Sequence, residues 1–250
     1  MTVKQTPKAQ KTRDHILETA LGLFASQGYD ETTMRDIAAA AGCSLGLAYR
    51  YFARKEEMVL ELYEQCAREL EEEVSKLPPG PLAGRFVSAI EADLRRISLY
   101  RTTMGALFSA GLAPNSEVAV LGDRVAGIRT RVWGIFRVVI VGATDTPKPA
   151  QVTQLATLFY AVHLLVVLFW LQDRSPAQER TYELLRFGRE TLGRLRPLLG
   201  LPPVAKPLAR LAGIVGPMFG PVESAANAGE DASDGDENGS RGSVPTGVGG

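Results

Sequence analysis

A short aromatic and basic stretch, residues 40–58, holds the side chains of this sequence best suited to bind another molecule. It reads "AAGCSLGLAYRYFARKEEM" and places Tyr49, Arg50, Tyr51 and Lys55 within seven residues. Hydroxyl, guanidinium and ammonium groups donate hydrogen bonds to phosphate oxygens, and arginine also pairs with the edge of guanine. The stretch is too short for a core helix and too aromatic for an ordinary loop. Its residue types therefore indicate contact with a nucleic acid.

Two short helices are needed to position these side chains, and both carry end signals. Residues 33–41 begin with Thr33 and Asp36 at the spacing of a capping box. Ser44 is placed to cap the next helix, which we expect at 44–52. Local hydrogen bonding alone therefore predicts where both helices begin.

The turn between these helices falls at Gly42, and small apolar residues around it allow a close crossing. The residues placed to pack there are Ile37, Ala38, Ala41, Cys43, Ala48 and Phe52. A longer amphipathic helix at 12–27 would brace the pair, which predicts a helix-turn-helix. A helical hairpin that packs without DNA is the alternative, but the exposed aromatic and basic residues favour DNA.

The second helix of such a motif lies in the major groove, with its N-terminal end against the base edges. On that basis we expect DNA contacts from Ser44, Leu45, Gly46, Leu47, Tyr49 and Arg50. Leucines can touch thymine methyl groups but cannot donate or accept hydrogen bonds. The sequence therefore does not predict which bases are read.

Residues 12–58 resemble the DNA-binding domain of the TetR-like (tetracycline-repressor-type) family of bacterial transcriptional regulators. The most specific parts of the resemblance are "GYDETTMRDIAAAAG" and "YRYFARKEEM". The rest of the chain matches that family in layout only, with two long helices near the C-terminus and a variable middle. The resemblance implies a helical ligand-binding and dimerisation domain after the helix-turn-helix.

The resemblance also implies roles for individual residues of the motif. Thr33 and Tyr49 match positions that contact phosphate, and Arg35 matches one that often reaches a base edge. Tyr51 stands where many members have histidine, near the DNA backbone, and Lys55 matches a lysine that meets phosphate at the start of the fourth helix. Leucine at positions 45 and 47 departs from the family, in which polar residues are common there.

Helical periodicity dominates the remaining sequence, so we predict an all-α protein. Further helices are expected at 55–77, 82–99, 100–111, 116–141, 149–172 and 176–199. The predicted domains are an N-terminal arm and helix-turn-helix (1–55), a helical regulatory and dimerisation domain (56–200), and a Pro/Gly-rich, acidic, largely disordered tail (201–250). Apolar residues at 208–219 would suit a short piece docked on the body, although glycines and prolines disfavour a helix there.

Residues 155–171 form an almost uninterrupted apolar run, which must be buried on nearly every side. Pairing with the helix at 176–199 would cover one face, and the same pair from a second subunit would cover the other, giving a two-fold four-helix bundle. The interface candidates are Val162, Leu165, Val166, Phe169, Tyr182, Leu185 and Leu192. A monomer core is the alternative, and membrane insertion is disfavoured by a run of 17 residues.

A ligand pocket is expected among the helices between residues 86 and 141. Its candidate lining is Phe86, Ile90, Leu94, Met104, Leu107, Phe108, Val132, Trp133 and Phe136. The scarcity of polar residues favours an apolar or weakly polar ligand, although the same spacing also suits plain core. Four nearby arginines could meet an acidic ligand but more simply lie on solvated helix faces: Arg95, Arg96, Arg129 and Arg131. His163 could be a sensor, but a hydrogen-bonded interface histidine is the simpler interpretation.

Composition excludes several classes of protein. The 250 residues have zero net charge, with a mildly basic front and an acidic rear, and 45% are hydrophobic. Cys43 and Cys66 give neither a disulfide framework nor a metal-binding spacing. The N-terminus lacks a secretory pattern, and no catalytic or phosphate-binding signature is present. We therefore expect a cytoplasmic protein that is not an enzyme and needs no cofactor or metal.

The sequence favours a ligand-responsive dimeric regulator, most simply a repressor that binds a palindromic operator in double-stranded DNA. A small apolar effector, unidentified from the sequence, would release it. An activator, or a constitutive DNA-binding regulator without an inducer, is the alternative.

Overall fold

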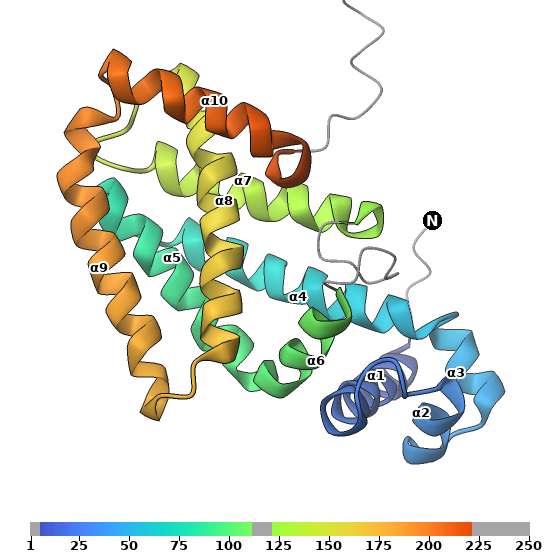
Figure 1. Cartoon of the computed structure of the whole chain (residues 1–250). Helices are drawn as coiled ribbons and strands as arrows, with labels where there is room; N and C mark the ends of the chain where they lie inside the picture. The colour runs from blue at the N-terminus through green and yellow to red at the C-terminus, as the bar shows by residue number, and fades with distance from the viewer. Residues whose placement is uncertain (1–5, 112–121, 222–250) are drawn as a thin grey trace, which may run out of the picture.

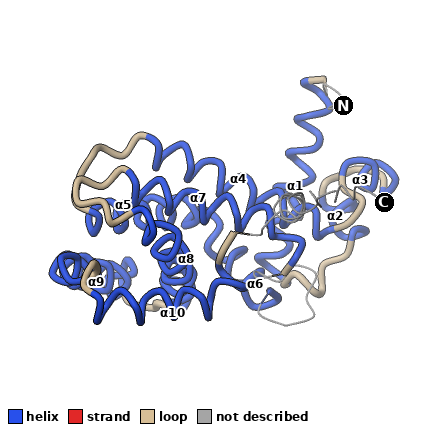
Figure 2. Tube along the Cα trace, turned by 90° about the horizontal axis from the view of Figure 1, so that it is seen from above, coloured by secondary structure: helices blue, strands red, loops and turns tan. Residues whose placement is uncertain are grey.

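A computed structural model describes residues 6–111 and 122–221, and all regular structure in these ranges is helical (Figures 1 and 2). The helices are α1 (Pro7–Gln27), α2 (Met34–Ala40), α3 (Leu45–Tyr51), α4 (Lys55–Ser75), α5 (Leu82–Ile97), α6 (Arg101–Gly111), α7 (Ala126–Val141), α8 (Pro149–Gln172), α9 (Glu179–Leu195) and α10 (Pro202–Phe219). The predicted fold class is confirmed. The helix expected at 116–141 begins only at Ala126, and residues 112–121 lie outside the described part.

The first three helices form a small head at one end of the molecule, and α4 runs from it into a larger helical body (Figure 1). Inside the head, Ile16, Phe24, Ile37, Ala48 and Phe52 are almost completely buried. The small side chain of Ala48 lets α3 cross close to α2. The head therefore has its own apolar core, which holds α3 on the outside of the molecule.

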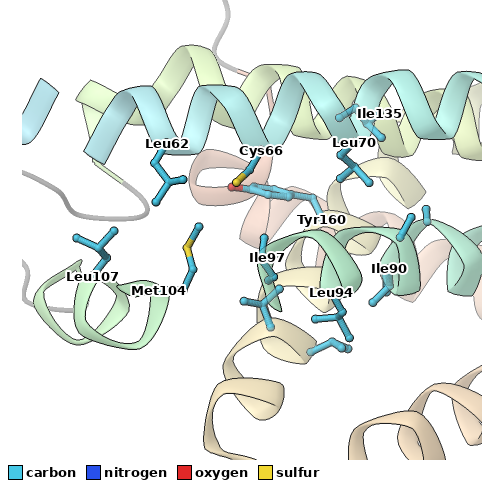
Figure 3. Packing of buried hydrophobic residues seen from close by; sticks show 14 of the residues in the cluster. Leu62, Cys66, Leu70, Ile90, Leu94, Ile97, Met104, Leu107, Ile135 and Tyr160 are labelled. Atoms are coloured by element: carbon cyan, nitrogen blue, oxygen red, sulfur yellow. The ribbon is translucent and has the colours of Figure 1, made fainter. Parts of the chain in front are cut away.

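The body packs helices α4 to α10 around the rest of the core. Helix α7 lies against both α4 and α8, and α9 lies on α5 rather than along α8. Figure 3 shows side chains from α4, α5, α6 and α7 converging, with Tyr160 of α8 extending toward Cys66. Helix α9 therefore pairs mainly with α5, and its expected contact with α8 is present but limited.

A buried arginine joins three chain segments of the body. Arg85 on α5 donates from Nε to the carbonyl of Val139 (3.0 Å) and from Nη1 to the carbonyls of Leu77 (2.9 Å) and Pro78 (2.6 Å). A Cβ at Gly142 would come within 2.5 Å of the Arg85 guanidinium. The arginine therefore supplies donors for carbonyls just after α4 and near the end of α7, and glycine makes room for it.

The turn between α8 and α9 is held by one carboxylate. Asp173 accepts hydrogen bonds from the backbone N–H and hydroxyl groups of both Ser175 (2.9 and 2.6 Å) and Thr181 (2.9 and 2.7 Å). These bonds, from Ser175 first, hold the pKa of Asp173 well below its usual range. Ala177 and Gln178 have φ of 48° and 55°, a left-handed conformation that non-glycine residues rarely adopt. The carboxylate network offsets this backbone strain and fixes the direction of α9.

Helix α10 corrects the expectation that residues 201–250 are a largely disordered tail. Residues 202–219 are helical and pack along α8, where the ring of Phe219 meets the ring of Tyr160 edge-on at 6.2 Å. Pro207 and Pro217 lie inside the helix. Each removes a backbone hydrogen bond. Contact with the apolar surface of α8 outweighs this low helix propensity. Residues 222–250 lie outside the described part.

The helix expected at 149–172 matches α8. Its apolar sequence raised the alternative that it inserts into a membrane. By length and composition alone α8 would be able to cross a membrane, but half of its apolar window is buried inside the fold. A mostly packed core helix passes the same test, so length and composition do not indicate a membrane span here.

The role of Arg85 predicts a large difference between two arginines of α5. Arg85→Ala should lower the free energy of unfolding by about 3 kcal/mol or more, because a buried acceptor left without its donor costs roughly 1–3 kcal/mol. Arg95→Ala on the exposed side of the same helix should change it by less than about 0.5 kcal/mol. Chemical denaturation of both variants measures this. Equal losses would show that Arg85 does not brace the body.

Candidate nucleic-acid interface and internal cavity

The ends of α2 and α3 are fixed by local hydrogen bonds. The Thr33 hydroxyl accepts from the Asp36 N–H (3.2 Å), and the Asp36 carboxylate accepts from the Thr33 N–H (2.9 Å), so the predicted capping box is confirmed. The Thr33 hydroxyl also donates to Asp36 Oδ2 (2.6 Å), and this bond first, with that from the Thr33 N–H, lowers the pKa of Asp36. Ser44 accepts from the Leu47 N–H (3.2 Å), as predicted. Gly42, at φ 63°, makes the turn between them.

The structure exposes most of the predicted DNA contacts on one side of the head. Thr33, Arg35, Ser44, Gly46, Tyr49 and Arg50 are exposed. The Tyr49 side chain is available to a phosphate because 49% of the residue is accessible. Leu45 and Tyr51 are half-buried and pack partly against the core, and Leu47 is also half-buried. The polar candidates therefore face solvent, whereas Leu45 and Tyr51 also help to hold α3.

Lys55 differs from its expected role as a phosphate contact. Its Nζ donates to the backbone carbonyls of Tyr29 (2.7 Å), Asp30 (3.2 Å) and Thr32 (3.1 Å). It also lies 4.3 Å from the centre of the Tyr29 ring. An ammonium group has three donors, and all three are used within the protein. Lys55 thus ties the loop between α1 and α2 to the start of α4, which corrects the sequence-based prediction.

Further contacts between head and body were not predicted. The buried Tyr29 donates its hydroxyl to Glu56 Oε1 (2.9 Å). Arg13 pairs with Glu61 Oε2 at 3.0 Å and lies 4.6 Å from the centre of the Phe52 ring. These residues are 27 or more positions apart, so no local spacing could reveal them. Together they attach α1 and α3 to α4.

A partly open cavity of about 110 Å³ lies in the body, between α4, α5, α6, α7 and α8. Its lining comprises Tyr63, Cys66, Ala67, Leu70, Asp93, Ile97, Met104, Phe108, Val125, Ile128, Arg129, Val132, Tyr160, His163, Leu164 and Val167. Of the nine predicted lining residues, Met104, Phe108 and Val132 are present. The cavity lies deeper than expected and includes α4 and α8, because α8 crosses the interior instead of lying wholly at a surface.

The other six predicted lining residues lie elsewhere. Leu94, Leu107 and Phe136 are fully buried core, and Trp133 donates from Nε1 to the Thr157 hydroxyl (3.1 Å). Phe86 and Ile90 line a separate surface groove. These six residues were predicted from their helical spacing, and that spacing is the same for residues that line a cavity and for residues of a fully packed core.

Of the polar groups in the cavity, His163 was named from the sequence and is hydrogen-bonded as expected, whereas Asp93 and Tyr63 were missed. Asp93 Oδ2 and His163 Nε2 are 2.6 Å apart, and Tyr63 is a third polar neighbour. His163 therefore lies in the cavity wall and not at an interface. Arg129, expected on a solvated face, is buried. The other three arginines pair with glutamates at the surface, as Arg131 does with Glu64 (3.1 Å).

The thiol and phenol groups of the cavity are uncharged at neutral pH. Burial raises the pKa of Cys66 to about 12 and that of Tyr160 to about 12. Among the described residues, no three metal-ligating side chains lie together.

An exposed apolar groove runs between α8 and α9, over α5. The predicted interface residues Val162, Leu165 and Phe169 are exposed along α8, with Leu165 65% accessible. Val166 and Leu185 are instead buried inward, and Tyr182 and Leu192 are half-buried. On α9 the exposed apolar residues are Leu184, Phe187 and Leu195, which were not predicted. They stand three and eight residues apart, a spacing that places them on one face of a helix, so a finer analysis of the α9 face would have revealed them.

Comparison with known proteins relates the head to a family and the chain to named regulators. Residues 16–62 match the model of the family described as bacterial regulatory proteins, tetR family. The HTH-type transcriptional regulator AcrR of Shigella flexneri is 41% identical over 87 residues, so the match spans only 40% of that relative's length. The HTH-type transcriptional repressor KstR of Rhodococcus jostii (strain RHA1) is 30% identical over 178 residues, covering 68% of this chain and 78% of KstR. The relatives are regulators, in agreement with the prediction that the chain is not an enzyme.

A solved structure extends the likeness of fold over most of the chain. The tetR-family transcriptional regulator from Streptomyces coelicolor superposes with a TM-score of 0.57 at 20% identity, covering 89% of this chain and 96% of that one. The likeness shows that the order and packing of the helices are shared.

The bonds of Lys55 predict a stability effect in the absence of DNA. Lys55→Met should lower the free energy of unfolding by about 2 kcal/mol, because three carbonyls lose a charged donor that is partly screened by solvent. Lys76→Met, an exposed lysine just after α4, is the matched control and should be neutral. Thermal unfolding of the two variants measures this. Unchanged stability of Lys55→Met, together with weakened DNA binding, would restore the phosphate-contact role.

Proposed function

This chain belongs to the tetR family of bacterial regulatory proteins, and from that premise we propose that it is a dimeric transcriptional repressor. It binds a palindromic operator and leaves it when a small, largely apolar ligand enters the cavity. The observation that carries the proposal is the exposed face of α2 and α3, held on a separately packed head. The repressor named among the relatives supports repression over activation.

The exposed face supports contact with double-stranded DNA in the cytoplasm. Arg35 on α2, before the turn, and Tyr49 and Arg50 on α3, after it, are all exposed to solvent. A helix of the length of α3 fits the major groove. Thr33, Ser44 and Gly46 lie at the N-terminal ends of α2 and α3. Backbone N–H groups at these ends can also donate hydrogen bonds to a phosphate. Lys55 and Tyr51 support this face from behind.

The groove between α8 and α9 supports a two-fold dimer. The exposed apolar residues there are Val162, Leu165, Phe169, Leu184, Phe187 and Leu195. Soluble monomers rarely expose so continuous an apolar patch. In a closed dimer the same helices of a second subunit cover it. Two heads would then face half-sites one helical turn of DNA apart, about 34 Å.

Helix α6 supports coupling between the cavity and the head. Met104 and Phe108 line the cavity, while Thr103 on the same helix donates to the Leu21 carbonyl of α1 (3.3 Å). At the start of α6, Arg101 donates to the carbonyls of Trp170 (2.9 Å) and Asp173 (2.7 Å), at the end of α8. A ligand that displaces α6 would therefore move α1. A constitutive regulator, the alternative, would not need a cavity joined to α1 in this way.

The two outward side chains predict different losses of DNA binding. Arg35→Ala should reduce discrimination at one base pair by about 1–3 kcal/mol if the arginine pairs with a guanine. Tyr49→Phe should weaken binding to all sequences about equally, because phosphate contacts carry no base information. Titration against DNA flanking the gene, and against a scrambled duplex, measures both. Equal weakening on the two duplexes by Arg35→Ala would remove its base-reading role.

The apolar groove predicts that a charge on α8 prevents assembly. Leu165→Glu should give a folded monomer or aggregate that no longer binds the operator, because an unpaired carboxylate is costly in a desolvated interface. Val138→Glu on α7 places the same charge on an exposed apolar residue outside the groove and should leave the dimer intact. Sedimentation and circular dichroism measure this. An intact dimer of folded Leu165→Glu would place the interface elsewhere.

A further inference from the structure

Two buried polar atoms in the cavity have no hydrogen-bond partner. They are Nδ1 of His163 and the hydroxyl of Tyr63, and both side chains line the cavity. Buried polar atoms in native proteins are almost always paired, and an exception calls for a physical explanation. Here the explanation can be the same for both: the two side chains line one cavity, and a molecule bound there would supply the missing partners.

The histidine is held in one orientation by its surroundings. Its Nε2 lies 2.6 Å from Asp93 Oδ2, and the two side chains are only 8% and 9% exposed. The ring also packs 5.2 Å from the Phe136 ring and 6.2 Å from the Tyr160 ring. A carboxylate can only accept, so Nε2 carries the proton and, in the neutral ring, Nδ1 is an acceptor. Asp93 thus orients His163 and leaves Nδ1 free for a ligand.

The remaining wall sets the size and charge of that ligand. Apart from the polar groups already named, the lining is formed by alkyl, thioether, thiol and aromatic side chains. A volume of about 110 Å³ suits a body of about one ring. Arg129 also lines the cavity, but it already has an interaction partner. Since Asp93 lies directly behind His163, an anion placed at Nδ1 would meet a nearby negative charge.

We infer that the cavity binds an uncharged, one-ring or similarly small apolar molecule carrying a hydroxyl group. The ligand hydroxyl donates to His163 Nδ1 and accepts from the Tyr63 hydroxyl. A hydroxyl can do both at once, whereas a carbonyl can only accept. Asp93 is a positioning residue, since it acts through the histidine. The inference rests on the proposed function only in taking this cavity as the effector site.

Phenol and toluene test the inference because they share one shape and differ in the hydroxyl. Calorimetric titration of the full chain should give at least tenfold tighter binding of phenol than of toluene. Tyr63→Phe removes a hydroxyl without changing the ring, and should weaken phenol about tenfold while leaving toluene unchanged. Tyr100→Phe, a half-buried tyrosine outside the cavity lining, is the matched control and should change neither.

The role of His163 has a direct spectroscopic measurement. The chain has two histidines, and His15 is exposed on α1, so it serves as an internal reference. In ¹⁵N spectra of the imidazoles, phenol should shift Nδ1 of His163 and leave His15 unchanged. Asp93→Asn should reduce the phenol preference and alter the tautomer signal of His163. Toluene should shift neither nitrogen.

The outcomes separate this inference from the proposed function. Equal affinity for phenol and toluene, or tighter binding of benzoate than of phenol, would overturn hydroxyl recognition. Operator binding without uptake of any of the three probes would also overturn it and leave the repressor intact. Phenol binding with the stated preference, in a protein that binds no DNA, would support the cavity assignment and overturn the proposed function.

Discussion

Helix α8 has to be covered by apolar surface on almost every side, and the arrangement of the body follows from that need. The helix is 24 residues long, with no charged residue along it. Helices α7 and α10 cover two of its sides, and α5 and α6 contribute further contacts. The uncovered strip carries Val162, Leu165 and Phe169. The need to cover α8 thus accounts for the packing of α10 against it. The strip of α8 that stays exposed is the face we propose a second copy of the chain covers.

The buried side of α8 also carries a polar residue in the otherwise apolar core, His163. His163 points inward, and its bond to Asp93 crosses from α8 to α5. Replacing a buried polar pair by apolar side chains of similar volume often leaves stability unchanged or improves it. Tight packing alone therefore does not explain this pair, in which Asp93 fixes the His163 ring while its second ring nitrogen has no partner among the described residues. A buried polar group in a cavity wall, such as His163, therefore says more about what the cavity binds than the apolar residues around it.

Sequence reasoning succeeded where the determining contacts are local. Thr33, Asp36 and Ser44 bond to backbone groups three residues away, so spacing alone located the ends of α2 and α3. It failed where contacts join distant segments. Lys55 bonds to carbonyls 23 or more positions away, and Asp93 meets His163 at a separation of 70. For α10, two internal prolines argued against a helix, and packing on α8 reversed that local preference.

The turn at Asp173 between α8 and α9 also has a consequence for subunit exchange between dimers. Asp173 bonds to residues two and eight positions further along the same chain, so a single subunit can set the angle between the two helices before a partner arrives. The ordering entropy of this angle is then part of folding and adds nothing to the cost of association. Subunits that dissociate would keep the groove between α8 and α9 in the conformation that binds a partner. Mixed dimers of differently labelled copies would therefore form at the rate of dissociation, without a slower refolding step.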